Sequence, residues 1–257
     1  MALCLLDCFL GCSIGAMVVT IVIYQGISDA PCLVFEALVN GTMHTISALM
    51  LALSRDRFRS VRDPIGYRAA VRRSVVWRHL ALAVLYGLTL GGGAFVASRR
   101  YLGSGLQLYT PLCDTFDWLL DPLNRPVALV SVSGNIVVDF GTIVYNARIM
   151  HCAWKAKNEI VGMAGAQRNL TEEAQRRRNM KIVVFTFKLA CLFVGCSLPY
   201  KVAILLYGLG LSVPRLVFDL LGLIRILYHV VDGWIVCTNS ELLEAMKLML
   251  CPCGNGE

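Results

Sequence analysis

The sequence predicts an all-α membrane protein, a bundle of six spanning helices followed by a short amphipathic helix. Three observations lead to this prediction. Hydrophobic residues make up 57% of the chain, charged residues only 16%, and the mean hydropathy is +0.64. The apolar residues form blocks of about 20 residues, the length that a helix needs to cross the hydrocarbon core. These blocks do not alternate with polar residues, as the strands of a membrane barrel would.

The apolar blocks predict spans at about 2–24, 32–54, 79–98, 127–150, 182–207 and 216–238. Residues 1–238 therefore form the predicted bundle, and residues 239–257 form an amphipathic helix and a tail. The first block could instead be a signal peptide. That alternative is weaker, because no basic residue precedes the block and the block contains Asp7.

The distribution of basic residues predicts the orientation in the membrane. Segments 55–78 and 148–181 carry eight basic residues each. The intervening loops, 25–31, 99–126 and 208–215, carry none, three and one. Because positive loops stay in the cytosol, both basic segments and both chain ends are expected there. The net charge of +7 is thereby explained without a nucleic-acid partner.

The segment after the last apolar block has the pattern of a short surface helix. Thr238-Asn239-Ser240-Glu241 has the spacing of a capping box, and the following turns separate charged from apolar residues. We expect this helix to lie on the inner leaflet, in contact with membrane lipids. Cys251 and Cys253 follow it, as candidates for palmitoylation or as free thiols.

The inner end of the second predicted span carries the triplet Asp56-Arg57-Phe58. Pro64 and Tyr67 follow the arginine by seven and ten residues, and Cys32 precedes it by 25. A lone arginine here could simply extend its charge to the membrane surface. Charge at this depth nevertheless indicates function. The four spacings together resemble the third helix of rhodopsin-like G-protein-coupled receptors.

This resemblance implies a disulfide and a polar core. Cys113 resembles the partner of Cys32, in the loop after the third predicted span. Asp7 resembles the acidic residue of the family's second helix, so a sodium ion is expected near it. Asp232 resembles the acidic residue at the inner end of the family's seventh helix. No other cofactor is expected.

The resemblance also implies switch residues on the last spans. Tyr145 resembles the fifth-helix tyrosine of the family, and Phe193 and Pro199 resemble sixth-helix residues. A proline inside a helix removes one backbone hydrogen bond and bends the helix. We therefore expect Pro199 to allow the inner half of its helix to swing outward.

Some positions depart from the family pattern. The resemblance implies that the first family helix is missing from the chain, and Ser197 stands where the family usually has a sixth-helix tryptophan. The last span has Asp232-Gly233-Trp234-Ile235-Val236, without the usual proline and tyrosine. Such loose motifs resemble the divergent serpentine chemoreceptors of nematodes.

Six residues in the outer halves of the spans are candidates for lining a ligand pocket. These are Glu36, Val39, Asn40, Lys201, Asp219 and Arg225. The alternative for each is packing or a polar contact between helices. Val39 stands where amine receptors carry an aspartate, which argues against an amine ligand. Arg225 lies in mid-span and needs a partner, which Asp219 or Asp232 could supply.

The resulting hypothesis is a receptor of the plasma membrane, with a chemosensory or unknown ligand, that signals to a heterotrimeric G protein. The sequence contains no nucleophile–base set, phosphate loop or metal spacing, so we expect neither an enzyme nor a metal protein. One alternative is a small transporter or channel, although only a few residues such as Asp139 interrupt the apolar spans. Another is a truncated, non-signalling receptor fragment.

Overall fold

A computed structural model describes residues 29–63, 66–67, 73–102, 125–162 and 170–238 of the chain. Every long element within these ranges is an α-helix, as the apolar blocks predict. The helices are α2 (Asp29–Arg62), α4 (Arg73–Leu102), α6 (Arg125–Gly162), α7 (Leu170–Gly208) and α8 (Arg215–Thr238). An all-helical membrane fold is therefore confirmed for the described part of the chain.

Four of these helices are long and apolar enough to cross a membrane. Their candidate spans are Ala37–Arg62, Ser74–Gly93, Arg125–Lys155 and Val184–Gly208. Helix α8 coincides with the expected span 216–238. The expected first span, 2–24, lies outside the described residues. The total of six spans therefore stays a prediction.

Several helices extend beyond the expected spans at the basic end of the bundle. Helix α2 continues through Arg62, eight residues past its expected span 32–54, and α7 begins at Leu170, twelve residues before its expected span 182–207. These helix ends are rich in charged residues, which water solvates, so the ends need no apolar surroundings. The apolar blocks mark the membrane-spanning part of each helix, and the charged continuations extend beyond it.

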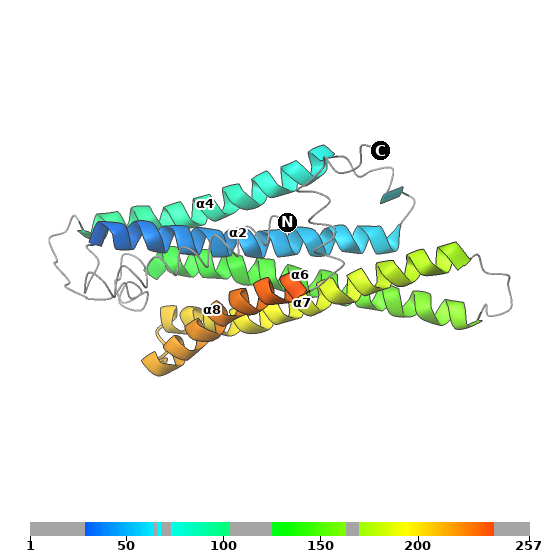
Figure 1. The fold of residues 1–257 in the computed structure, drawn as a ribbon. Helices are drawn as coiled ribbons and strands as arrows, with labels where there is room; N and C mark the ends of the chain where they lie inside the picture. The colour runs from blue at the N-terminus through cyan, green and yellow to red at the C-terminus, as the bar shows by residue number, and fades with distance from the viewer. Residues whose placement is uncertain (1–28, 64–65, 68–72, 103–124, 163–169, 239–257) are drawn as a thin grey trace.

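The five helices run alternately up and down (Figure 1). The ends of α2 and α6 and the starts of α4 and α7 therefore lie at one end of the bundle, on the right in Figure 1. Both basic segments, 55–78 and 148–181, reach this end. Their shared position agrees with the positive-inside rule, which makes this the cytosolic end.

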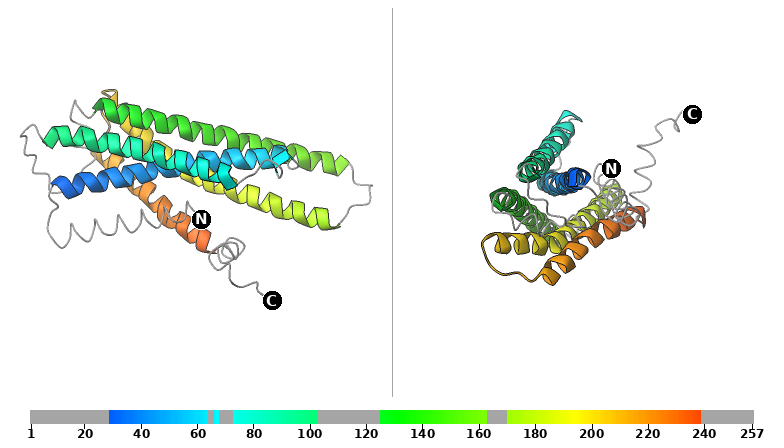
Figure 2. Two further views of the ribbon diagram at one scale, coloured as in Figure 1. Left: turned by 90° about the horizontal axis from the view of Figure 1, so that it is seen from above. Right: turned by 90° about the vertical axis from the view of Figure 1, so that its left-hand side faces the viewer.

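Neighbouring helices pack in a continuous series. Helix α4 packs on α2, α2 on α6, α6 on α7, and α7 on α8. Seen end-on, α4 and α8 lie at opposite sides of the bundle (Figure 2). The outward faces carry exposed apolar side chains, among them Leu88, Val130, Val137, Phe140 and Leu216. In a membrane protein these side chains face lipid rather than water.

Glycines allow α2 and α4 to approach closely. A Cβ atom added at Gly91 would lie 2.7 Å from the carbonyl oxygen of Ala37 and 2.8 Å from the Cα of Gly41. Gly87 meets Gly41 and Thr45 in the same way, one turn earlier on α4. Small residues four apart are typical of helix contacts inside membranes, where packing drives association.

The apolar core lies where α2, α7 and α8 meet. Its centre is Phe193, which is 2% exposed, beside Met43, Ile46, Met50 and Tyr228. The rings of Phe193 and Tyr228 meet edge-on at 5.3 Å. A second cluster joins α6, α7 and α8 towards the outer end, and includes Ala128, Tyr200, Ile204 and Phe218. Helix α7 contributes to both clusters and is therefore the central packing element.

Candidate functional site

The triplet at the inner end of α2 is held by a residue beyond the helix. The hydroxyl of Tyr67 donates a hydrogen bond of 2.8 Å to Oδ2 of Asp56. Tyr67 is held in turn by its backbone N–H, which donates to the carbonyl of Asp63 at 2.9 Å. The backbone N–H of Gly66 donates to Oδ1 of Asp63, also at 2.9 Å. Asp63 therefore ends α2 and fixes the turn that returns Tyr67 to Asp56.

Arg57 lies beside this contact without sharing it. Its guanidinium could either pair with Asp56 or remain available to a partner protein. In the described part of the chain Asp56 bonds to Tyr67, and the buried Nε of Arg57 has no hydrogen-bond partner. A buried donor without a partner is costly, so the arginine gains free energy when a partner reaches it.

Two further contacts join the inner ends of α2 and α6. The ring of Phe58 lies 5.8 Å from the ring of Tyr145. The Nδ2 of Asn146 donates to Oγ of Ser54 at 2.8 Å, and both side chains are buried. Two residues that the resemblance singled out, Phe58 and Tyr145, are thus brought together. Asn146 and Ser54 add a polar contact beside them.

The predicted switch residues of α7 differ in burial, because Phe193 is buried and Pro199 is exposed. Pro199 lies inside α7, which continues to Gly208. Phe193 is at the centre of the inner apolar core, one and a half turns before the proline. The core contact is therefore on the inner side of Pro199, where a movement of the cytosolic half of α7 would disturb it.

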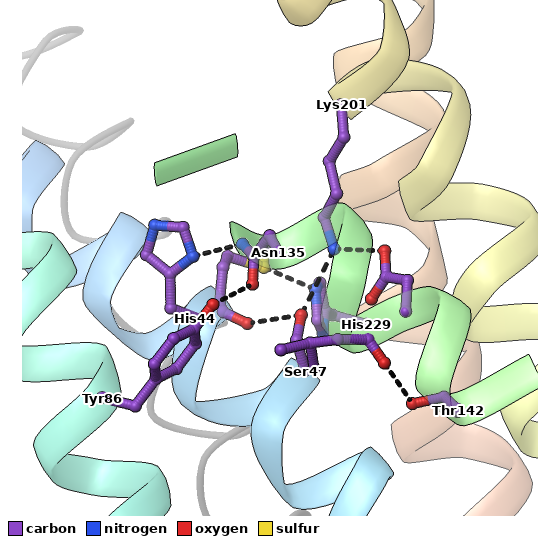
Figure 3. Close-up of polar contacts among 10 residues, drawn as sticks. His44, Ser47, Tyr86, Asn135, Thr142, Lys201 and His229 are labelled. Atoms are coloured by element: carbon purple, nitrogen blue, oxygen red, sulfur yellow. Dashed lines mark hydrogen bonds and ion pairs between the residues drawn. The ribbon is translucent and has the colours of Figure 1, made fainter. Parts of the chain in front are cut away.

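A buried ion pair connects α7 with α6 in mid-membrane. The Nζ of Lys201 lies 2.6 Å from Oδ2 of Asp139, and the two side chains are 6% and 0% exposed. The same Nζ donates to Oγ of Ser47 on α2 at 3.3 Å and lies 5.4 Å from the ring of Phe193. Figure 3 shows Lys201 reaching from α7 into this cluster. In surroundings of low polarity, separating two opposite charges costs a large free energy.

A polar network beside the ion pair joins α2, α4 and α6 (Figure 3). His44 bonds to Oγ of Ser131 at 2.9 Å through Nε2, and to the amide of Asn135 through Nδ1. The hydroxyl of Tyr86 donates to Oδ1 of Asn135 at 3.4 Å, and its ring meets His44 edge-on. Inside a membrane these bonds hold helices that have little hydrophobic drive to associate.

Arg225 contacts an aromatic ring in the described part of the chain. Its guanidinium lies over the ring of Tyr200, 5.0 Å from the centroid. Asp219 is exposed and forms no ion pair with Arg225, because it lies on the outer surface of α8. The side chain of Asp232 is outside the described part of the chain. A cation–π contact with an aromatic face is a favourable arrangement for a poorly hydrated arginine.

The candidate pocket residues fall into different environments. Val39 packs against the inner core cluster, Asn40 is partly exposed on α2, and Lys201 is paired with Asp139. Asp219 is exposed, and Arg225 covers Tyr200. Those candidate pocket residues whose side chains the structure describes therefore do not converge on one site. Their role in ligand binding stays a prediction.

Several residues singled out from the sequence lie outside what the structure describes. These are Asp7, Pro64, Cys113, Cys251 and Cys253, and the side chains of Cys32, Glu36 and Asp232. The expected disulfide, sodium site, palmitoylation sites and amphipathic C-terminal helix of 239–257 thus stay predictions. The described cysteines Cys152, Cys191 and Cys196 carry free thiols.

The sequence interpretation missed the mid-membrane network. Asp139 was noted only as an interruption of an apolar span, and His44, Tyr86 and Asn135 were not selected. A signal was present, because a carboxylate and an ammonium group near the middle of two spans each need a partner. Their pairing depends on the relative height of α6 and α7, which residue spacing within each span does not give.

The chain matches a known protein family. The model of the family described as 7 transmembrane receptor (rhodopsin family) matches residues 1–232, from before α2 into α8. No curated protein matches the chain.

Proposed function

The chain belongs to the rhodopsin family of seven-transmembrane receptors, and we propose that it transmits an extracellular ligand signal to a heterotrimeric G protein at the plasma membrane. The observation that carries this proposal is the arrangement around Arg57. Its neighbour Asp56 is bonded to Tyr67, while the buried Nε of Arg57 has no partner in the described part of the chain. The arginine thereby keeps an unpaired donor that a cytosolic partner could reach once it is uncovered.

The mechanism follows from the packing of α7. A ligand shifts a receptor only by binding one conformation better than the other. Lys201 and Phe193 lie on the same helix, one bonded to α6 and the other packed against α2 and α8. Outward movement of the inner half of α7, hinged at Pro199, would loosen the Phe193 core and uncover Arg57.

The ligand would enter from the outer half of the bundle. Arg225 over Tyr200 offers a cation on an aromatic surface, and Asn40 is a separate, partly exposed polar side chain on α2. Val39 supplies no carboxylate for an amine. These features support a ligand with an acceptor group, such as a carboxylate or a carbonyl, rather than a biogenic amine.

The test replaces Arg57 and measures nucleotide exchange. Purified protein in nanodiscs is mixed with a panel of heterotrimeric G proteins, and basal guanine-nucleotide exchange is recorded without added ligand. We expect Arg57→Ala to abolish the exchange that the unmodified protein supports, with surface expression unchanged. Arg78→Ala is the matched control, because Arg78 is an exposed arginine at the same end, on α4. Unchanged exchange in Arg57→Ala, or equal loss in both variants, would contradict the proposal.

A further inference from the structure

A cleft of about 360 Å³ lies at the cytosolic end of the bundle, between α2 and α4. It is separate from the mid-membrane network and from the outer half where a ligand would enter. Its walls are the last turns of α2, the turn that holds Tyr67, and the first turns of α4. The lining residues that carry charge or a polar ring are Arg55, Asp56, Arg59, Arg62, Asp63, Tyr67 and His79.

Three arginines of the cleft form one row on α2. Arg55, Arg59 and Arg62 are spaced four and three residues apart, so they share a helix face, and all three are exposed. None of them forms an ion pair with a carboxylate among the residues that the structure describes. The spacing places three like charges on one helix face, with the guanidinium of Arg62 6.0 Å from the ring centroid of Phe58, and their repulsion favours an anion.

The two acids of the cleft already have donors. Asp56 accepts the hydroxyl of Tyr67 at 2.8 Å, and Asp63 accepts the backbone N–H of Gly66 at 2.9 Å. These carboxylates therefore compete less strongly for the arginines than free ones would. His79 adds a ring nitrogen from α4 on the opposite wall. The cleft thus combines an arginine row with a further donor.

The position of the cleft along the helices suits a lipid headgroup. It lies where the expected span 32–54 ends and the expected span 79–98 begins, at the basic end of the bundle. On α4, next to the lining residues Val75 and His79, Val76 is 60% exposed and Trp77 is 63% exposed. Tryptophan is enriched at the membrane–water interface. A cationic cleft with an apolar outer edge fits an amphiphile with an anionic head.

We propose that this cleft binds the phosphorylated headgroup of an inner-leaflet lipid, a phosphoinositide carrying phosphomonoester groups. Guanidinium groups bind phosphate oxygens in pairs, and a phosphomonoester carries more charge than the diester of an ordinary lipid. Basic pockets between membrane helices on the cytosolic side are suited to such headgroups. Val76 and Trp77 would contact the acyl chains. The site uses none of the residues that we assign to ligand entry, and its occupancy is measured without a G protein.

The experiment measures lipid binding to the purified full chain. Nanodiscs of phosphatidylcholine containing a trace of fluorescent phosphatidylinositol 4,5-bisphosphate report binding by energy transfer from a labelled receptor. We expect Arg59→Gln/Arg62→Gln to weaken binding roughly 30-fold, from the typical contribution of a basic residue near anionic lipid. Arg148→Gln is the control, an exposed arginine on the cytosolic part of α6 outside the cleft, and should bind as the unmodified protein does.

Three outcomes would overturn the proposal. The first is equal affinity of the double variant and the unmodified protein, and the second is equal loss in Arg148→Gln. The third is competition by soluble inositol trisphosphate or inorganic phosphate at the concentration of the lipid, which would make a free phosphate the ligand. Arg59→Lys/Arg62→Lys keeps the charge but loses paired bonding, and should bind with intermediate affinity. Size-exclusion profiles establish that each variant is folded.

Discussion

The ammonium group of Lys201 lies 2.6 Å from the carboxylate of Asp139, with both side chains withdrawn from the surface. One group comes from α7 and the other from α6, and Ser47 of α2 completes the contact at 3.3 Å. Separating such charges in mid-membrane requires each to find another partner. The pair therefore holds α7 against α6 at the height of Pro199, the residue at which α7 is expected to bend.

Replacing one member of this pair should destabilise the bundle more than replacing both. Lys201→Met leaves Asp139 charged and unpaired, which costs about 3–5 kcal/mol for a buried pair. Lys201→Met/Asp139→Asn leaves no buried charge and should recover most of that loss. The measurement is the thermal unfolding of detergent-solubilised protein, followed by fluorescence size exclusion. Equal losses in the single and double variants would show that the two side chains act independently.

Tyr67 should control the availability of Arg57. In Tyr67→Phe the carboxylate of Asp56 loses its donor, and the neighbouring guanidinium is then the nearest replacement. A hydrogen bond to a charged group contributes about 1.5–3 kcal/mol, and partial exposure places this one near the lower figure. We expect basal nucleotide exchange to fall about fivefold to tenfold.

A second variant separates this mechanism from a general loss of structure. Asp56→Asn removes the charge that would capture Arg57, so it should not lower exchange. Adding Tyr67→Phe to Asp56→Asn should then change nothing further. A fall in exchange in the combined variant would mean that Tyr67 acts through some other contact.

The Tyr67 hydroxyl should remain protonated over a wide pH range. Burial, followed by the hydrogen bond to Asp56, raises the pKa of Tyr67 from 10.0 to about 12. The folded protein thus favours the neutral phenol, and this stabilisation is complete below about pH 10 and is lost as the pH rises through 12. Tyrosinate absorbance should lose one late-titrating group in Tyr67→Phe. In Asp56→Asn the pKa of Tyr67 should fall, and an unchanged titration there would contradict the assignment.

The close contact of α2 and α4 should be sensitive to one methyl group. In Gly91→Ala the new Cβ would meet the carbonyl of Ala37 at 2.7 Å, a contact that backbone atoms cannot easily relieve. Such overpacking costs about 1–3 kcal/mol. Gly92→Ala is the control, because no atom lies within 4 Å of its added Cβ and alanine favours a helix. Thermal unfolding should place Gly91→Ala below the unmodified protein and Gly92→Ala at or above it.

The inner end of α2 could be predicted in large part from the sequence. The spacing of Asp56-Arg57-Phe58 from Tyr67 indicated residues that act together, because chain connectivity alone keeps them at one end of one helix. The structure adds that Tyr67, rather than Arg57, bonds to Asp56. That choice depends on the turn fixed by Asp63, whose side chain accepts the Gly66 N–H, a local detail that family spacing does not contain.

The mid-membrane network could not be predicted in this way. Lys201 was selected as a ligand contact, and Asp139 was noted only as an exception within an apolar span. For each residue, the sequence correctly indicated that a charge inside a membrane needs a partner. It did not indicate that the two residues pair with each other. Likewise, the sequence did not indicate that Arg225 covers Tyr200 of α7.

The sequence by itself determined that the chain spans a membrane as helices, which end of the bundle is basic, and where the family motif of α2 lies. These properties depend on hydrophobic length, charge and spacing along one helix, all of which are local. Tertiary structure decided that Asp139 meets Lys201, that His44 meets Asn135, and that Gly91 meets Ala37. Such partners are set by the height and rotation of neighbouring helices, because in lipid they are chosen by packing and polar contacts rather than by hydrophobic burial.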